Sequence, residues 1–198
     1  MRQLDELSMK TIEDSIRNIL VALGEDPDRE GLIETPHRVA KMYNEVFEGM
    51  RYTNDEIAEM YNKCFNEPEA HDLVCVSNID AFSYCEHHIA LMYNLKVSVA
   101  YIPKGKVIGL SKIVRIVDMV SKRLQLQERI GEDIAYIIEK ITGTDNVMVV
   151  ISGEHSCMTA RGIKRPGTVT HSAVLHGMFR DSQALRNEVY SMIQEDKK

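Results

Sequence analysis

The spacing of the apolar residues changes near residue 68, and this change limits what the chain can fold into. Before it, apolar side chains recur every three or four residues, the spacing of one face of an α-helix. After it they alternate, as in a half-buried strand, and the clearest run is Leu95, Val97, Val99 and Tyr101. The sequence therefore predicts a helical extension over residues 1–68 and a domain of strands and helices over residues 69–198, the two forming one structural unit.

The N-terminal extension is predicted to hold two helices. The first covers residues 9–23 and ends at Gly24; its apolar face is Ile12, Ile16, Ile19, Leu20 and Leu23. Thr35 is predicted as the N-cap of the second helix and Pro36 as its first residue, because proline fits the first turn, where no backbone N–H is needed. The second helix is expected to bury Val39, Tyr43, Val46, Phe47 and Met50.

The rest of the chain changes between strand and helix patterns. Strands are predicted over residues 73–80, 95–101, 107–110, 146–152 and 165–175. Two helices precede the fourth of these strands: Ser111 caps the first, and Gly143 ends the second. The apolar face of the first is Ile113, Val114, Ile116, Val117 and Val120, and that of the second is Leu126, Ile130, Ile134, Ile137, Ile138 and Ile141. A last helix begins near Asp181 and buries Leu185 and Val189.

A short turn at residues 103–106 separates two predicted strands, which favours antiparallel pairing. The expected fold class is α+β: an antiparallel sheet with helices on one face, preceded by the helical extension. With the short strand 107–110 set aside, the predicted sheet has four strands and open edges, and pairing with other subunits is one way to close them.

The composition argues against several classes of protein. The chain has 198 residues, of which 44% are hydrophobic and 27% charged, and no apolar run approaches the ~18 residues of a membrane span. A formal net charge of −6 argues against a nucleic-acid binder. The N-terminal residues lack the apolar stretch of a signal peptide, and four cysteines without an export signal argue against a disulfide framework, so a cytoplasmic protein is expected.

The charge is unevenly distributed along the chain. Residues 96–129 contain eight basic side chains but only two acidic ones, Asp118 and Glu128. Such a stretch can hold a small anionic ligand, or it can be a solvated helix face. Charge alone leaves both interpretations open.

The densest chemical signal is the run Cys85-Glu86-His87-His88. Cys85 and His88 are three residues apart, so one tight turn can direct both at a single point, and Zn²⁺ binds thiolate and imidazole readily. Cys157 can supply a third ligand, and three protein ligands leave the open position of a catalytic zinc. His87 and His155 then remain as candidate proton shuttles, with His155 and Cys157 on the same face of an extended segment.

Spacing alone does not settle the metal site, because a buried cysteine is often only a small apolar side chain. The structural interpretation is favoured for Cys64, Cys75, His37, His71 and His176.

Three further segments carry polar groups with a possible role in binding. Ser111, Lys112 and Arg115 lie in or near the first turn of a predicted helix, where free N–H groups favour an anion. The second segment is residues 125–129, with the carboxylate of Glu128, and the third is residues 161–165, which begins with Arg161. A solvated helix or turn would explain any one of them alone.

Taken together and in this order, the segments resemble the GTP cyclohydrolase I family. The matching stretches are residues 34–43, 85–88, 99–103, 107–112, 125–129 and 155–158 with 161–162. The likeness extends from about residue 12 to about residue 189, and six motifs in register are highly specific.

The resemblance implies a tunnelling fold and a set of site residues. It implies that zinc is held by Cys85, His88 and Cys157, and that His87 and His155 are catalytic. It implies that ribose and triphosphate are bound by Ser111, Lys112, Arg115 and Arg161, that Arg38 reaches a neighbouring subunit's triphosphate, and that guanine is recognised by Gln127 and Glu128.

The family's reaction is the conversion of GTP and water to 7,8-dihydroneopterin triphosphate and formate, which opens folate and pterin synthesis. The resemblance also implies a homodecamer of two stacked pentamers with sites at subunit junctions. The chain departs from the common family pattern at residues 89–92, which lack a proline, and at His171 and His176.

Two other functions are compatible with the sequence. One is a related enzyme that opens the purine ring of GTP but releases a different product. The other is a zinc- or purine-binding protein without turnover, against which the two spare histidines argue.

Overall fold

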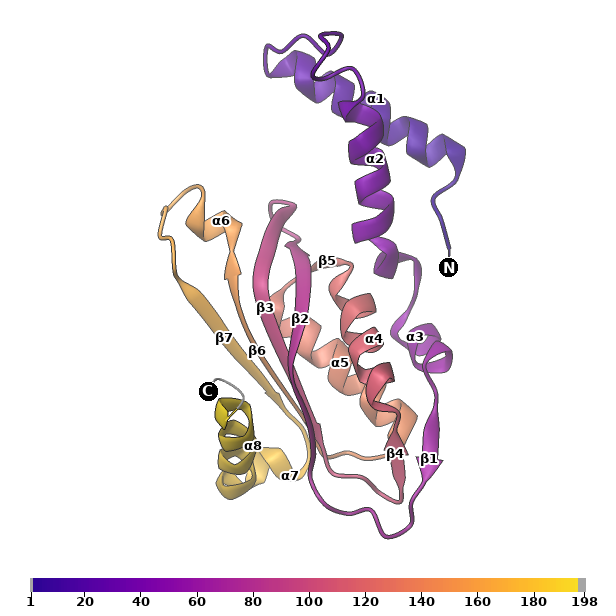
Figure 1. Cartoon of the computed structure of the whole chain (residues 1–198), viewed down its shortest axis with the longest axis vertical. Helices are drawn as coiled ribbons and strands as arrows, with labels where there is room; N and C mark the ends of the chain where they lie inside the picture. Colours follow the sequence, from indigo (N-terminus) through magenta and orange to yellow (C-terminus); the bar gives the residue numbers. More distant parts are fainter. Residues whose placement is uncertain (1, 196–198) are drawn as a thin grey trace. The chain divides into compact units, whose positions relative to one another are not determined.

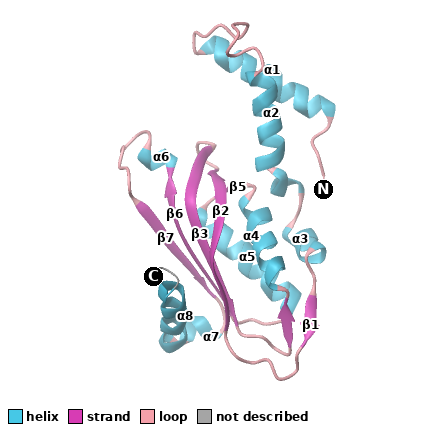
Figure 2. Cartoon of the chain, viewed as in Figure 1, coloured by secondary structure: helices cyan, strands magenta, loops and turns pink. Residues whose placement is uncertain are grey.

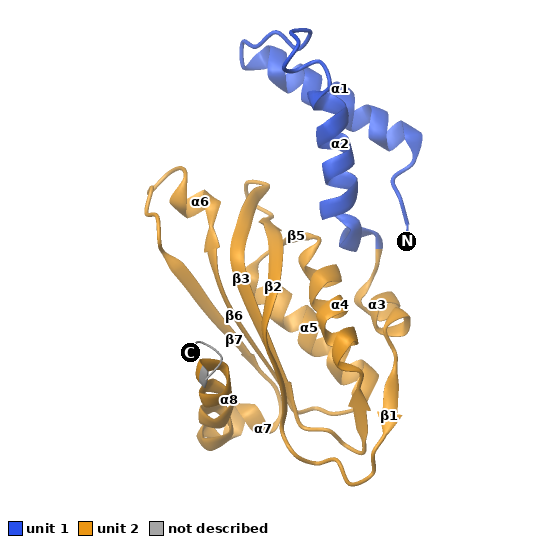
Figure 3. Ribbon diagram, viewed as in Figure 1, with its two compact units in different colours: residues 1–51 blue, residues 52–198 orange. Residues whose placement is uncertain are grey.

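The structure is a computed structural model that describes residues 2–195, and it divides into two compact units, residues 1–51 and 52–198 (Figure 3). The sequence pattern predicts the boundary between extension and domain at residue 68, whereas the structure has it after residue 51. Between these two positions lie a helix, α3 (Asn54–Met60), and a strand, β1 (Cys64–Asn66), which both belong to the second unit.

The first unit consists of α1 (Glu6–Ala22), α2 (Thr35–Val46) and the short 3₁₀ helix η1 (Glu48–Arg51). Asp5 caps α1 by accepting a hydrogen bond from the backbone N–H of Ser8. The N-cap of α2 is Glu34, so the prediction that Thr35 caps this helix is wrong by one residue.

The apolar residues of the first unit are less buried than the sequence predicts. Only Pro36 and Ala40 are buried within α2, and Met50 is 55% exposed. The other four residues expected to be buried, Val39, Tyr43, Val46 and Phe47, are half-buried. The reason is geometric: a unit made of two main helices can cover only one stripe of each.

The main sheet of the second unit has the strand order β5-β2-β3-β6-β7 (Figure 2). Its strands are β2 (Val74–Cys85), β3 (Ala90–Tyr101), β5 (Leu124–Gln125), β6 (Val147–His155) and β7 (Val169–Leu175). All neighbouring pairs are antiparallel except β2 and β5. The predicted antiparallel sheet is therefore confirmed, although β2 and β6 extend beyond their predicted ends to Cys85 and His155.

The strand after the turn at residues 103–106 does not join this sheet. β4 (Lys106–Ile108) pairs instead with β1, a strand that the sequence analysis missed. Both edges of β3 are already occupied by β2 and β6, so no edge remains for β4. The turn therefore leads into a separate two-stranded sheet.

Two long helices, α4 (Leu110–Ser121) and α5 (Gln127–Thr142), pack against one face of the main sheet and form the core with it (Figure 1). Gly143, with φ +73°, ends α5 as predicted. Two predictions for α4 are wrong. Gly109 is its N-cap, so Ser111 lies inside the first turn, and Val114 is 44% exposed because it points away from the sheet.

The C-terminal segment covers part of the other face of the sheet. It consists of α7 (Met178–Asp181) and α8 (Gln183–Glu195), and Val189 is buried as predicted. Phe179 and Val189 form a second apolar cluster with Ala100 and Met148 of the sheet. Among the described residues, no helix has the length and apolar character needed to cross a membrane.

Candidate metal centre and active site

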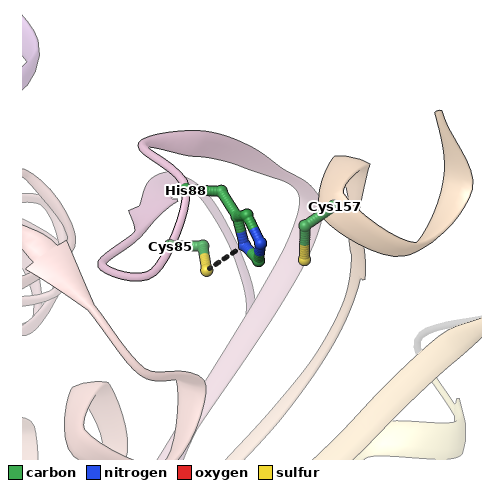
Figure 4. A group of neighbouring side chains, drawn as sticks. All are labelled: Cys85, His88 and Cys157. Carbon is green, nitrogen blue, oxygen red and sulfur yellow. Dashed lines mark hydrogen bonds between the residues drawn. The ribbon is translucent and has the colours of Figure 1, made fainter. Parts of the chain in front are cut away.

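Cys85, His88 and Cys157 come together at one end of the sheet (Figure 4). Cys85 is the last residue of β2, and His88 lies in the tight turn that leads to β3. In that turn the backbone N–H of Ile89 donates to the carbonyl oxygen of Cys85 over 2.9 Å, and Ile89 has φ +51°. The turn thus places Cys85 and His88 on the same side, as the sequence spacing predicts.

Cys157 lies in a one-turn helix, α6 (Ser156–Thr159), that directly follows β6. The prediction that His155 and Cys157 share a face of one extended segment is therefore wrong. The last register pair of β6 with β3 is Met92 with His155, and the chain turns into α6 where this pairing ends.

The three side chains fit a zinc ion. One ligand atom from each residue, two sulfurs and one nitrogen, lies within 4.8 Å of the others. Tetrahedral Zn²⁺ with bonds of about 2.0–2.3 Å holds its ligand atoms about 3.3–3.8 Å apart, so a small inward movement of the side chains suffices. Two thiols and an imidazole are also the donor types that zinc prefers.

The Cys157 thiol is disfavoured from ionising by its surroundings. Burial raises the pKa of the Cys157 thiol, and the neighbouring Cys85 raises it further. A cation between the two sulfurs would reverse this effect, because a coordinating thiol loses its proton.

Two further histidines are close to these ligands along the chain: His87 adjoins His88, and His155 is two residues before Cys157. His87 Nδ1 is 3.8 Å from Cys85 Sγ, and His155 Nε2 is 2.8 Å from Oε1 of Gln127. Burial lowers the pKa of His155, and the charge of Glu128 opposes this shift. Glu128 is therefore close enough to act on His155 electrostatically.

The start of α5 is tied to the metal-binding turn. The backbone N–H of Glu86 donates to the carbonyl oxygen of Gln125 over 3.1 Å, and the Glu86 carboxylate pairs with Arg129 over 2.6 Å. Arg129 lowers the pKa of Glu86 through this contact. No local sequence pattern indicates the pairing of Glu86 with Arg129, because the two residues are 43 positions apart.

The short helix α6 is held by a second polar network that the sequence analysis also missed. Tyr93 Oη lies 3.1 Å from Thr159 Oγ1 and 3.3 Å from Glu154 Oε2, and Asn94 donates to Glu154 over 2.9 Å. These contacts join β3 to both ends of the segment that carries His155 and Cys157.

Among the predicted substrate residues, Arg161 and Glu128 lie near the cluster. Arg161 Nη1 donates to His88 Nε2 over 2.7 Å, and the Glu128 side chain is exposed at the start of α5. Gln127, by contrast, is only 2% exposed. Arg38 belongs to the first unit, where it pairs with Glu34 over 2.6 Å.

One chain does not bring Ser111, Lys112 and Arg115 to the metal-binding end. The residues that follow α4 lie beside this end, because Gln125 pairs with Cys85. The residues that precede α4 lie at the other end of the sheet, since the N–H of Ile108 donates to Oη of Tyr101 over 3.2 Å. Lys112 is separated from the C-terminal end of α4 by roughly 15 Å of helix at about 1.5 Å per residue.

An antiparallel sheet backed by helices, with two thiols and an imidazole at one end that could hold a metal ion, is the architecture of a metal-dependent enzyme. The sequence model of the GTP cyclohydrolase I family matches residues 12–194. This chain belongs to the GTP cyclohydrolase I family.

Relatives from several bacteria match nearly the whole chain. A protein of Clostridium botulinum (strain Kyoto / Type A2) named GTP cyclohydrolase 1 is 59% identical over 189 residues, which cover 92% of this chain and 96% of the relative. The GTP cyclohydrolase 1 of Clostridium acetobutylicum is 57% identical over 190 residues, 94% of this chain and 97% of the relative. That of Ruminiclostridium cellulolyticum is 58% identical over 188 residues, 92% of this chain and 96% of the relative.

Proposed function

We propose that this enzyme converts GTP and water to 7,8-dihydroneopterin triphosphate and formate, with a zinc ion held by Cys85, His88 and Cys157. The observation that carries the proposal is the grouping of three ligand atoms within 4.8 Å of one another, with His87 and His155 close by. Family membership and the high identity to proteins named GTP cyclohydrolase 1 support the same reaction.

The metal ligands and the histidines have separate tasks. A zinc ion held by Cys85, His88 and Cys157 would lower the pKa of water and so make hydroxide available near neutral pH. His155 and His87 transfer protons: a proton leaves the water that adds to C8 of the purine, and a ring nitrogen gains one as the C8–N bond breaks. A second hydrolysis releases C8 as formate, and the rearranged ribose closes onto the freed amine.

Glu128 is the proposed contact to the guanine base. Guanine presents N1–H and an exocyclic NH₂ side by side, and an ionised carboxylate can accept both hydrogen bonds. The structural alternative for Glu128 is an ion pair with Arg129 or Lys122. Within residues 2–195, Arg129 instead pairs with Glu86, and Lys122 pairs with Asp118.

The triphosphate is proposed to bind at a junction between copies of the chain. Ser111, Lys112 and Arg115 are polar groups suited to a polyanion, but Ser111 and Lys112 lie toward the end of the sheet opposite the metal ligands, and Arg115 lies at the middle of α4. The site is completed when a second copy of the chain places the N-terminal end of its α4 next to the metal ligands of the first copy. We extend this arrangement to a decamer of two pentamers in which Arg38 reaches a neighbouring site and Arg161 contributes from the metal side.

The proposed chemistry suits the cytoplasm. Cys85 and Cys157 must remain reduced to hold a metal, and both are free thiols in the structure. The substrates are water and a nucleotide, and no nucleic acid or membrane is required.

The test is metal analysis of the purified protein together with a formate assay and mass spectrometry of the product made from GTP. About one zinc per chain, formate release and a dihydroneopterin triphosphate product support the proposal. Zinc with a different product indicates the related ring-opening enzyme, and zinc or GTP binding without formate indicates a binding protein. A Cys75→Ser variant is the control, because Cys75 lies outside the metal cluster and should leave all three results unchanged.

A further inference from the structure

The side chain of Gln127 is held in one orientation. It is the first residue of α5 and is only 2% exposed. Its Nε2 lies 3.3 Å from the carbonyl oxygen of Ile151, 3.2 Å from that of Thr170 and 3.1 Å from Oγ of Ser172. Because carbonyl oxygens only accept hydrogen bonds, the end of the amide that faces β6 and β7 must be the NH₂ group.

The other end of the same amide faces His155. Oε1 of Gln127 lies 2.8 Å from Nε2 of His155, and an amide oxygen only accepts. Nε2 must therefore carry the hydrogen. A neutral imidazole has one N–H donor and one acceptor nitrogen, so the lone pair is on Nδ1. Within residues 2–195, no hydrogen bond engages Nδ1 of His155.

We infer that Gln127 is a positioning residue that holds His155 as the Nε2–H tautomer, which leaves Nδ1 as the atom that accepts a proton in the reaction. This inference rests on the proposed function, because it specifies how His155 performs the proton transfer proposed there. A proton from the water that adds to C8 goes to Nδ1, and the ring becomes an imidazolium. The same proton then passes to the purine nitrogen that leaves C8, while Nε2–H remains bonded to Gln127.

The proposed role of Gln127 differs from the contact to guanine that the family resemblance implies for it. Both N–H groups of its amide have acceptors inside the protein, and the side chain is almost fully buried. Recognition of the guanine edge then depends on Glu128, the exposed neighbour. Gln127 acts on the substrate only through His155.

The first test is magic-angle-spinning NMR of zinc-loaded, ¹⁵N-histidine-labelled protein without GTP, at an alkaline pH where the rings are neutral. The ring nitrogens with and without hydrogen give well separated resonances, and a His155→Gln variant identifies the signals of His155. We expect Nδ1 without hydrogen and Nε2 with hydrogen. A hydrogen on Nδ1 overturns the inference, whatever the variants below show.

The second test compares Gln127→Met with Gln125→Met. Both glutamines are buried and both donate to a backbone carbonyl, but Gln125 binds Val120 and Asp133 and does not contact His155. Gln127→Met should give a mixture of His155 tautomers, whereas Gln125→Met should keep the wild-type signals. A wild-type tautomer in Gln127→Met contradicts the inference.

Kinetics separate a positioning role from a guanine contact. Gln127→Met should lower kcat by at least about tenfold, less than the ~10²–10⁴-fold loss expected when a general base is removed, with GTP affinity within about twofold of wild type. A weaker affinity for GTP with unchanged kcat would instead assign Gln127 to the base. The tautomer is measured on protein without GTP, so the NMR result does not depend on the proposed function. The proposed function fails separately if wild-type protein releases no formate from GTP.

Discussion

The two ends of the catalytic sheet are built differently. At the metal-binding end, His88, His155 and Glu86 are each held by hydrogen bonds or ion pairs to other elements. Toward the other end, the first two turns of α4 present Ser111, Lys112 and Arg115, and no side-chain hydrogen bond or ion pair within residues 2–195 engages these three. The first end is organised by the chain itself, whereas the second has free polar groups.

This difference follows from what each end has to do. A metal centre and a proton shuttle need fixed distances and a fixed tautomer, so supporting contacts from the same chain are an advantage. Cationic side chains for a triphosphate need only be available, and internal partners would compete with the ligand. The contrast between the two ends therefore indicates that the free polar groups of α4 bind a ligand or another subunit. Each prediction below tests one part of this contrast.

The largest expected effect is on the metal. Cys157→Ser should reduce bound zinc well below one per chain and abolish formate release, because a hard hydroxyl replaces a soft thiolate. Metal analysis and the formate assay measure this, with Cys75→Ser as the control. Full zinc occupancy with normal activity would remove Cys157 from the ligand set.

The second prediction tests whether the two ends meet in different subunits. His155→Ala should keep zinc and lose roughly 10²–10⁴-fold in turnover, since a proton-transfer group is missing. Lys112→Ala should lose activity mainly through weaker GTP binding. When the two inactive variants are unfolded, mixed in equal amounts and refolded together, sites formed by two different chains should recover about a quarter of wild-type activity.

The control for that experiment is the double variant His155→Ala/Lys112→Ala refolded with wild type. If each site is formed by two chains, an equal mixture of the double variant with wild type also leaves about a quarter of the sites intact. If both ends of a site belong to one chain, the same mixture leaves about half of the sites intact. No recovery in the first mixture, together with half activity in the second, would place both ends in one chain.

The grouping of Cys85 with His88 could be predicted from the sequence because its signal is local. Cys85 and His88 are three residues apart, and one turn is enough to bring them together. The same holds for Gly143, whose positive φ ends α5 through the conformation of a single residue. Patterns that depend on a few neighbouring residues can be recognised without knowing the tertiary structure.

What the sequence did not predict depends on partners that are distant along the chain. The bond of Gln127 to His155 needs α5 and β6 in contact, and the pairing of β4 with β1 depends on the edges of β3 being occupied. β1 has three residues, too few for an alternating pattern to be visible. Val114 belongs to the apolar stripe by spacing but faces away from the sheet, which only the packing of α4 reveals.

The third prediction concerns the base. Glu128→Gln turns one acceptor oxygen into a donor that faces a donor, which should cost about 1–3 kcal/mol in GTP binding, or roughly 5- to 150-fold. Wild type should bind GTP best, inosine triphosphate (which lacks the amino group) less well and ATP least, and the variant should flatten this ranking. Zinc content should not change.

Titration calorimetry with the three nucleotides measures this ranking. Asp118→Asn is the matched control, because Asp118 is the other acidic residue in the basic stretch 96–129 and pairs with Lys122. An unaltered ranking in Glu128→Gln would return Glu128 to the solvated surface.

The smallest expected effect comes from the contacts that hold α6. Tyr93→Phe removes the hydroxyl that lies 3.1 Å from Thr159 Oγ1 and 3.3 Å from Glu154 Oε2, while Asn94 still holds the Glu154 carboxylate. The loss should be about 0.5–1.5 kcal/mol, as for a typical internal hydrogen bond. Because α6 carries Cys157, part of this loss should appear as a severalfold weaker zinc affinity in competition with a chelator.

Tyr136→Phe is the control. It removes a tyrosine hydroxyl bonded to Asp55 on the exposed side of α5, so it should leave zinc affinity unchanged. Equal zinc affinities in the two variants would show that the metal end does not depend on the contacts between β3 and α6, and the contrast between the two ends would then rest on Glu86, Gln127 and Arg161 alone.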